Sequence, residues 1–323
     1  MKIALLINRE NFDNCSDWKD AGFELVHLGN GIPDPDTVTA TKAQVLIVDA
    51  VMKIGPEIIK NMPELKLIHS QGVAFNAIDL EEARRSDIFV CNNAGMNAKP
   101  VAEQAVLLML ALIKNFRHNE DMVYAGSQIE AKISYFKNGL TELSDLKVGL
   151  VGFGAIAEEL TALLRPFGCD INYYRRSGDC RAEGAVFLPL NELYASSDIV
   201  SLHVPVTPET VNMINGNTLK LFKQGAILIN TSRGELADHA AVAAALKSGK
   251  LGGFGSDTLS PEPVTADNPF LVLLTEEIRS RVALSPHIAG ITTGSFKRAY
   301  EHMRRNIEAV AGGRRPDCVV NGL

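Results

Sequence analysis

The sequence has little cysteine, and its cysteines share no pattern. The five are Cys15, Cys91, Cys169, Cys180 and Cys318, an odd number with no Cys-x-x-Cys pair among them. This scatter argues against a disulfide framework and against a zinc site built on paired cysteines. The seven histidines form no His-x-x-x-His pair either, so the sequence predicts no metal site.

Long apolar runs and basic stretches are also missing. The apolar run at the N-terminus, 3–7, is too short for a signal peptide. No segment approaches the roughly 20 apolar residues that cross a membrane. The net charge is -6, with no basic stripe to neutralise phosphates. These absences favour a cytoplasmic globular protein whose partners are small molecules, and neither nucleic acid nor a membrane.

The length and the apolar pattern predict two α/β domains. A chain of 323 residues exceeds one ordinary core and fits two domains of roughly 150 residues, which implies a cleft. Apolar strands alternate with amphipathic segments in two series, as in parallel sheets covered by helices on both faces. Strands are expected at 2–7, 24–28, 44–48, 65–69 and 88–91, and then at 147–151, 170–174, 198–202, 226–230, 252–256 and 282–284.

Several helices can be placed between these strands. Asp79 is expected to cap one helix start, and the segment 238–249 carries an N-cap aspartate, an apolar stripe and a terminal glycine. The run 101–113 is apolar nearly all round, which predicts a helix buried between domains or subunits. The stretch 126–144 that follows is expected to be polar and irregular.

A glycine-rich turn follows the first strand of the second series. Gly152 permits a tight turn, Gly154 lets the backbone approach a pyrophosphate, and Ala157 lets helix and strand pack closely. The amides of Ala155 and Ile156 would then point at phosphate from a helix N-terminus. Such a turn can also simply close a strand-to-helix corner, but the flanking periodicity favours dinucleotide binding.

The end of the next strand indicates which dinucleotide binds. Asp170 lies at the wrong end of this strand to accept the ribose hydroxyls of NAD. The groups at the correct end are Arg175, Arg176 and Ser177, which suit a 2′-phosphate. The sequence therefore predicts NADP(H) as the preferred cofactor, with NAD(H) possible. The alternative is that both arginines form a solvated edge and specificity rests elsewhere.

Three charged residues in distinctive contexts predict a hydride-transfer site. Arg233 follows Asn-Thr-Ser, Glu262 lies between two prolines, and His287 follows a proline. A guanidinium can clamp a 2-oxo acid carboxylate, an imidazolium can protonate the carbonyl oxygen, and a carboxylate can hold that imidazole charged. Each context alone is typical of a turn or an exposed loop. Their joint occurrence after a dinucleotide loop is what favours catalysis.

The ordered motifs resemble the D-isomer-specific 2-hydroxyacid dehydrogenases, a family that includes glyoxylate and hydroxypyruvate reductases, D-lactate dehydrogenases and phosphoglycerate dehydrogenases. The resemblance covers nearly the whole chain through 65–79, 97–103, the glycine turn, 203–210, 230–234, 255–258, 261–263 and 286–290. It implies two doubly wound parallel-sheet domains, a Rossmann coenzyme-binding domain at 99–291 inserted into a flavodoxin-like substrate domain at 1–98 and 292–323. It also implies that a helix from about 292 to 311 returns to the first domain.

Further roles follow only from the resemblance. Arg233 would bind and polarise the substrate, His287 would be the general acid in contact with both substrate and cofactor, and Glu262 would be its partner. Amides at Val73 and Ala74 would take the substrate carboxylate. Asp257 would meet the nicotinamide carboxamide, and the remaining cofactor contacts would come from Val204, Pro205, Thr210 and Thr231. His203 is expected to support the cofactor loop structurally.

The expected activity is NADPH-dependent reduction of a small 2-oxo acid, glyoxylate or hydroxypyruvate, to the D-2-hydroxy acid. Apolar loop residues such as Val51, Met52 and Phe75 also suit a larger substrate. One alternative is therefore an NADH-linked D-lactate or phenyllactate-type dehydrogenase. Another is a dinucleotide-sensing binding protein with little turnover. A homodimer is expected because the apolar helix after Pro100 would be costly to leave in water.

Overall fold

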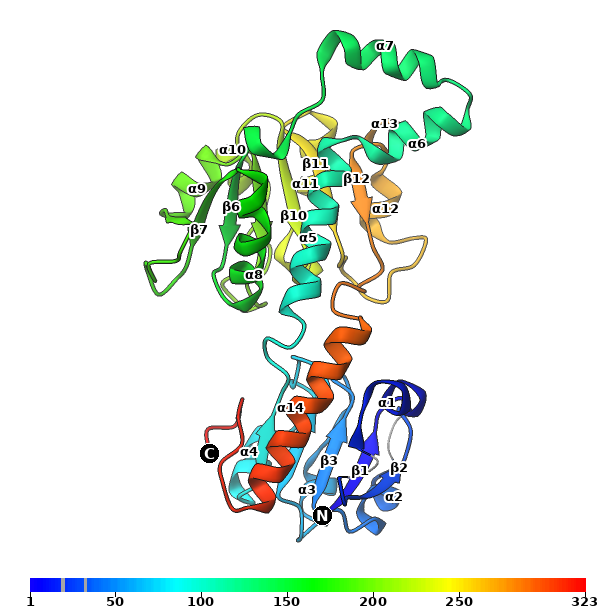
Figure 1. Ribbon diagram of the computed structural model, residues 1–323, viewed down its shortest axis with the longest axis vertical. Helices are drawn as coiled ribbons and strands as arrows, with labels where there is room; N and C mark the ends of the chain where they lie inside the picture. The colour runs from blue at the N-terminus through cyan, green and yellow to red at the C-terminus, as the bar shows by residue number, and fades with distance from the viewer. Residues whose placement is uncertain (19–20, 32–33) are drawn as a thin grey trace. The chain divides into compact units, whose positions relative to one another are not determined.

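A computed structural model describes residues 1–18, 21–31 and 34–323. The chain divides into two compact units, which are described separately (Figure 1). Unit 1 comprises Met1–Asn97 and Ile291–Leu323, and unit 2 comprises Ala98–Gly290. Unit 2 is therefore an insertion in the sequence of unit 1. Within the described residues, no helix combines the length and the apolar character needed to cross a membrane.

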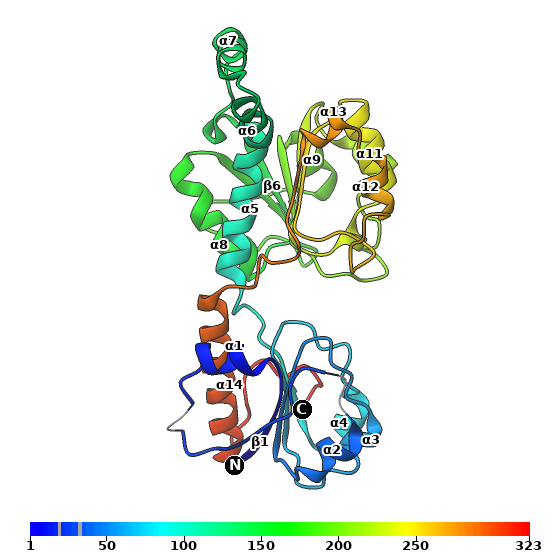
Figure 2. The same cartoon turned by 90° about the vertical axis from the view of Figure 1, so that its right-hand side faces the viewer.

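Unit 1 is a five-stranded parallel sheet in the order β2-β1-β3-β4-β5. Its strands are β1 (Lys2–Leu6), β2 (Glu24–His27), β3 (Val45–Val48), β4 (Leu67–Ser70) and β5 (Phe89–Cys91). One face is covered by α1 (Arg9–Cys15) and α14 (Thr293–Ala311), and the other by α2 (Pro35–Ala40), α3 (Pro56–Ile59) and α4 (Leu80–Arg85) (Figure 2). The strands are apolar on both sides because helices bury both faces.

Unit 2 is a seven-stranded parallel sheet in the order β12-β11-β10-β9-β6-β7-β8. Its strands are β6 (Lys147–Val151), β7 (Asp170–Tyr174), β8 (Val186–Phe187), β9 (Ile199–Leu202), β10 (Ala226–Asn230), β11 (Leu251–Ser256) and β12 (Val282–Leu284). The strand order reverses between β6 and β9. In open α/β sheets, ligands bind beyond the carboxyl ends of the strands at such a switch point.

Helices cover both faces of this sheet as well. One core joins the sheet to α5 (Ala98–Ile113) and α8 (Ala155–Leu164). The core on the other face involves α9 (Leu190–Ser196), α10 (Gly216–Leu221), α11 (His239–Lys247), α12 (Pro269–Leu273) and α13 (Glu276–Arg279). The predicted fold class, two doubly wound parallel-sheet domains, is confirmed.

The cap residues behave as their chemistry predicts. The Asp79 side chain accepts a hydrogen bond from the Glu82 amide at 2.9 Å, and Asp238 accepts from the amides of Ala240 and Ala241. Gly249 follows the C-cap residue Ser248 with φ of +73°, the left-handed conformation that glycine adopts at low cost. The long C-terminal helix α14 belongs to unit 1.

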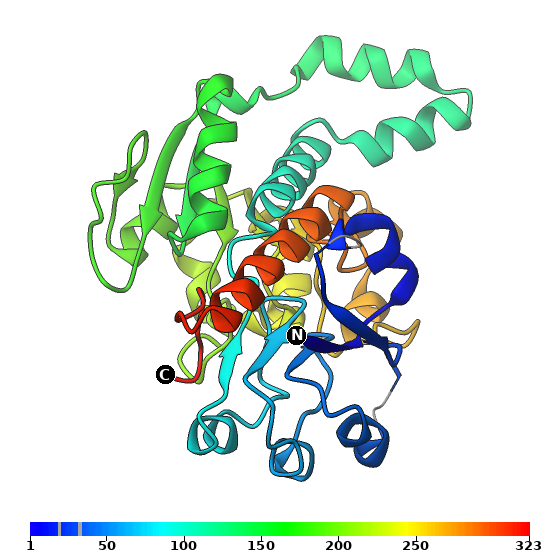
Figure 3. The ribbon, with the colours of Figure 1, turned by 60° about the horizontal axis from the view of Figure 1, so that its bottom comes forward.

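The prediction for the stretch 126–144 is wrong. It contains α7 (Gln128–Asn138), which follows α6 (Phe116–Tyr124), and none of the residues in these two helices is buried. The helices project from the rest of unit 2 (Figure 3). Ile129, Ile133 and Phe136 recur at helical spacing, and this apolar period predicts the helix that the polar composition obscures. The short strand β8 was also not predicted.

Candidate active site

The glycine turn after β6 leaves space for a dinucleotide. Gly152 has φ of +96°, and a Cβ there would lie 2.4 Å from the carbonyl oxygen of His203, so only glycine fits. Gly154 caps α8 with no side-chain hydrogen bond, and a Cβ on it would meet nothing within 4 Å. The first amides of α8, at Ala155 and Ile156, are thus free of a capping side chain. This arrangement fits the pyrophosphate of a nicotinamide dinucleotide.

The loop after β9 is braced by its own side chains. The Thr210 hydroxyl donates to the carbonyl oxygen of Pro205 at 2.7 Å and accepts from the Thr207 amide at 2.7 Å. Next to Val204, the His203 ring bonds the Ser201 hydroxyl at 2.9 Å. Burial lowers the pKa of His203 to about 4, so the ring is neutral at physiological pH. His203 therefore supports the glycine turn through its backbone and carries no charge to the site.

The predicted 2′-phosphate residues form an exposed turn after β7. The Gly178 amide donates to the carbonyl oxygen of Arg175 at 3.0 Å, and Arg175, Arg176 and Ser177 are all exposed. The Thr207 hydroxyl lowers the pKa of Glu209, and the Arg176 charge adds to this shift. Arg176 is therefore near the loop that follows β9.

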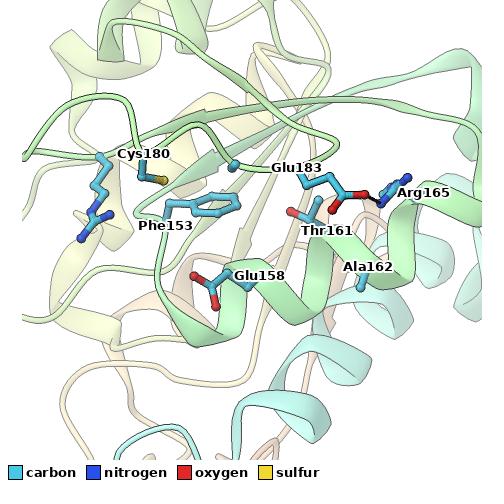
Figure 4. A pocket seen from close by; sticks show the side chains of 9 residues that line it. Phe153, Glu158, Thr161, Ala162, Arg165, Cys180 and Glu183 are labelled. Atoms are coloured by element: carbon cyan, nitrogen blue, oxygen red, sulfur yellow. Dashed lines mark hydrogen bonds and ion pairs between the residues drawn. The ribbon is translucent and has the colours of Figure 1, made fainter.

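A cavity of about 390 Å³ lies between α8 and the segment after the turn (Figure 4). Arg175 is one of the residues that line it. Glu158 of α8, Phe153 and Cys180 line it too. The ion pair between Arg165 and Glu183, with 3.0 Å between Nη1 and Oε1, also belongs to its wall (Figure 4). The Glu158 carboxylate in this cavity would repel a phosphate, which opposes the attraction from Arg175.

The three predicted catalytic residues follow three adjacent strands. Arg233, Glu262 and His287 come after the carboxyl ends of β10, β11 and β12, which are neighbours in the sheet. His287 Nδ1 lies 2.9 Å from each carboxylate oxygen of Glu262. Because a carboxylate only accepts, Nδ1 carries the proton in this pair and Nε2 is left for a substrate. Both side chains remain accessible, with exposures of 42% and 43%.

Arg233 lies in a loop that packs against the Glu262 loop. A Cβ on the neighbouring Gly234 would lie 2.3 Å from the amide nitrogen of Ser260, which shows how closely the two loops approach. The buried Asn230 side chain donates to the carbonyl oxygen of Arg233 at 2.8 Å and fixes the loop. The guanidinium is exposed and bonds the carbonyl oxygen of Ser232 at 2.7 Å. The structure thus joins His287 to Glu262 and places the Arg233 loop beside them.

Two other predicted cofactor residues are buried. Thr231 is 6% exposed, and within the described part of the chain its hydroxyl has no hydrogen-bond partner. Asp257 is 1% exposed, and its carboxylate accepts from the amides of Ile288 and Ala289. These bonds tie Asp257 to the His287 loop, a function that its motif did not reveal.

The residues predicted to bind the substrate carboxylate follow β4 in unit 1. The Asn92 side chain donates to the carbonyl oxygen of Val73 at 2.7 Å, and the Ser70 hydroxyl donates to that of Ala74 at 2.6 Å. Among the described residues, the amides of Val73 and Ala74 have no acceptor. Hydrogen bonds to its carbonyl oxygens therefore hold the loop, and the two amides remain available as donors. Asn92 was not singled out from the sequence, since it carries no motif of its own.

Comparisons with known proteins agree with this geometry. Residues 106–289 match the family model described as D-isomer specific 2-hydroxyacid dehydrogenase, NAD binding domain. A glyoxylate reductase from Thermococcus litoralis is 34% identical over 274 residues, covering 83% of this chain and 81% of the relative. One from Thermococcus gammatolerans is 32% identical and covers 99% of this chain and 96% of the relative.

The solved structure of D-2-hydroxyisocaproate dehydrogenase superposes over the full length of both chains, with a TM-score of 0.85 and 26% identity. The matched residues include the glycine turn and Arg233, Glu262 and His287, which lie within the region covered by the family model. The chain is an oxidoreductase that depends on a nicotinamide dinucleotide, and it belongs to the D-isomer-specific 2-hydroxyacid dehydrogenase family.

Proposed function

We propose that the protein reduces a small 2-oxo acid of the glyoxylate or hydroxypyruvate type to the corresponding D-2-hydroxy acid, with NADPH as the reductant. The observation that carries this proposal is the His287–Glu262 pair, at 2.9 Å, beside the Arg233 loop. The curated relatives named glyoxylate reductase support the substrate class. A general acid next to a carboxylate and a guanidinium suits protonation of a carbonyl oxygen during hydride addition.

Each residue has a distinct task in this reaction. The glycine turn at Gly152 and Gly154 would hold the dinucleotide, whose dihydronicotinamide would supply a hydride to the carbonyl carbon. His287 Nε2 gives its proton to the carbonyl oxygen, so that the C=O group becomes CH–OH. Glu262 accepts from Nδ1, which orients the ring and stabilises its positive charge until the proton leaves. Arg233 binds the substrate carboxylate and polarises the carbonyl. In unit 1, the free amides of Val73 and Ala74 are donors of the kind that bind a carboxylate.

The preference for NADPH rests on Arg175, Arg176 and Ser177. Arg175→Asp should weaken NADPH binding by about 10- to 100-fold, because a charge-assisted hydrogen bond is replaced by a like charge. NADH binding should change little. Arg181→Asp is the matched control, since Arg181 is an exposed arginine a few residues further along the same segment. Equal effects of Arg175→Asp on both dinucleotides would overturn the cofactor assignment.

A larger substrate is the competing proposal. Val51 is 83% exposed and Val73 is 40% exposed, on loops that follow the adjacent strands β3 and β4. Exposed apolar side chains at these positions favour an apolar substrate group, as in a D-lactate or phenyllactate-type dehydrogenase using NADH. The purified protein, mixed with each dinucleotide and with glyoxylate, hydroxypyruvate or phenylpyruvate, separates the choices by the loss of cofactor absorbance. Oxidation with no substrate would favour the cofactor-sensing protein instead.

The partner is a second copy of this chain, held through α6 and α7. The expected interface, α5, packs within unit 2 against α8, β10, β11 and β12, and it does not need a second chain to cover most of its apolar side chains. The projecting helices instead carry a group of six exposed apolar side chains, which are Phe116, Val123, Tyr124, Ile129, Ile133 and Phe136. Leaving such a surface in water is unfavourable, which supports a homodimer.

A further inference from the structure

The buried Asp257 accepts hydrogen bonds from four residues of the loop that carries His287. Its Oδ1 accepts from the Ile288 amide at 3.0 Å and from the Ser285 hydroxyl, and its Oδ2 accepts from the Ala289 amide at 2.9 Å. Its main-chain carbonyl oxygen accepts from the His287 amide at 2.8 Å. Asp257 thus hydrogen-bonds residues that precede and follow His287 in the sequence.

The backbone conformation of His287 explains why these hydrogen bonds are needed. His287 has φ of +58°, the left-handed region that residues with a side chain rarely adopt. The amides of His287, Ile288 and Ala289 point toward one aspartate only while this turn is maintained. The hydrogen bonds therefore hold the backbone in a conformation that it would otherwise leave, and that conformation directs the ring toward Glu262.

A second chain of hydrogen bonds fixes the aspartate itself. Gln104 of α5 donates from Nε2 to the Ser285 hydroxyl oxygen at 2.9 Å. Since the hydroxyl oxygen accepts from Gln104, its own proton is directed to Asp257. The Asp257 amide also donates to the carbonyl oxygen of Asn230, at the end of β10, at 3.0 Å. Residues in or next to α5, β10 and β12 therefore fix Asp257, and all of these elements belong to unit 2.

We infer that Asp257, with Ser285 and Gln104, positions His287 for proton transfer. This role rests on the proposed function of His287, and it differs from a contact with the nicotinamide carboxamide. Asp257 is 1% exposed, and donors of the loop occupy three of the about four acceptor positions of its carboxylate. Acting through the backbone of another residue makes Asp257, Ser285 and Gln104 positioning residues.

Substitution of the aspartate tests the inference directly. In Asp257→Asn, the new amide group must face one of the loop's donors, so the turn should relax. The expected result is a fall in kcat of about 10- to 100-fold, the scale for misplacing a reacting group by about 1 Å. The affinity for NADPH, measured by fluorescence titration, should change less than about threefold. A large loss of NADPH affinity with kcat retained would overturn the inference in favour of a carboxamide contact.

The serine provides a rescue test with a matched control. Ser285→Ala removes the hydroxyl and should lower kcat, and Ser285→Thr keeps the hydroxyl and should restore it. Ser280→Ala is the control, because Ser280 precedes the opposite end of β12 and its hydroxyl bonds the carbonyl oxygen of Glu277 at 2.9 Å. Equal activity of the alanine and threonine variants at position 285 would contradict the inference.

A double-mutant cycle separates the failure of this role from the failure of the proposed function. If Asp257 acts through His287, then Asp257→Asn should cost little further activity in a His287→Ala background. Full additivity would show that Asp257 acts elsewhere. If the wild type reduces no 2-oxo acid, the proposed function fails, and hydrogen exchange still tests the positioning. The Ile288 and Ala289 amides should exchange faster in Asp257→Asn, and unchanged protection would overturn it.

Discussion

Unit 1 should lose stability in mild acid because two neutral histidines, His69 of β4 and His302 of α14, are buried where the helix packs on the sheet. His69 is fully buried and His302 is 3% exposed. Asn306 Nδ2 lies 3.0 Å from His69 Nε2 and 3.4 Å from His302 Nε2. Asn306 Oδ1 accepts from the Asp317 amide at 2.9 Å, so the amide nitrogen is the atom that faces the rings. This nitrogen also donates to the carbonyl oxygen of Asp317 at 3.1 Å, and the nearer ring nitrogen, His69 Nε2, accepts its other proton. A ring nitrogen that faces this donor must be free of a proton, which requires an uncharged imidazole.

The pKa shifts give the sign and the size of the effect. Burial lowers the pKa of His69 to about 3, and burial followed by the Arg305 charge lowers the pKa of His302. The unfolded chain, with pKa values near 6.5, binds these protons first, so the stabilisation is complete above about pH 6.5 and is lost as the pH falls toward 3. For His69 alone the loss at about pH 5 is roughly 2 kcal/mol. His302 adds to it with the same sign.

The single tryptophan makes this measurable within unit 1. Trp18 is 2% exposed, and its Nε1 donates to the carbonyl oxygen of Tyr300 in α14 at 3.2 Å. Urea unfolding followed by tryptophan fluorescence at about pH 7.5 and about pH 5 should give free energies of unfolding that differ by about 2 kcal/mol or more.

A substitution removes the titration while keeping the hydrogen bond. His69→Gln can present an amide oxygen to Asn306 but cannot take up a proton. The variant should be less stable at neutral pH by about 1 to 3 kcal/mol, and its stability should depend less on pH. His118→Gln, at an exposed position of α6, should leave the pH dependence unchanged. The reasoning would be refuted by an equal pH dependence in wild type and His69→Gln.

Three further predictions concern unit 2. Glu262→Gln should lower kcat/KM in steady-state assays about 100-fold, because an amide stabilises the imidazolium of the reaction less well, and NADPH affinity should be retained. Gly152→Ala should abolish NADPH binding in fluorescence titrations, because its Cβ would lie 2.4 Å from the carbonyl oxygen of His203, whereas Gly154→Ala should fold normally. Ile133→Asp on α7 should convert the dimer to a monomer in sedimentation experiments, and a wild type that already sediments as one chain would contradict the dimer.

Sequence patterns predicted the elements that contain a regular apolar period. Every predicted strand is present with ends within about two residues, because an apolar run between turn residues has few other stable conformations. The pattern failed at α7, where a polar composition was given more weight than the spacing of Ile129, Ile133 and Phe136. The apolar side chains of α7 are exposed, so this helix lacks the core contacts that accompany the apolar period of a buried helix.

The site was predictable where residue type carries the chemistry. Arg233, Glu262 and His287 were singled out because a guanidinium, a carboxylate and an imidazole are the groups that hydride transfer to a 2-oxo acid needs. The contributions of Gln104 and Ser285 were not recognised. A glutamine on a helix and a serine after a strand fit many surroundings, and their meaning depends on a hydrogen bond at 2.9 Å that only the folded chain provides.

Strand order explains which long-range contacts a sequence can reveal. The strands β10, β11 and β12 are consecutive in the chain and adjacent in the sheet, so the loops that carry the three predicted catalytic residues become neighbours with no other strand between them. The contact between Gly152 and His203 is different, because β6 pairs with β9 across two intervening strands in sequence. Recognising that contact requires knowing where the sheet order reverses. At the switch point, the glycine pattern of the sequence predicts a dinucleotide. The reason why Gly152 must be glycine, its closeness to His203, becomes clear only from the fold.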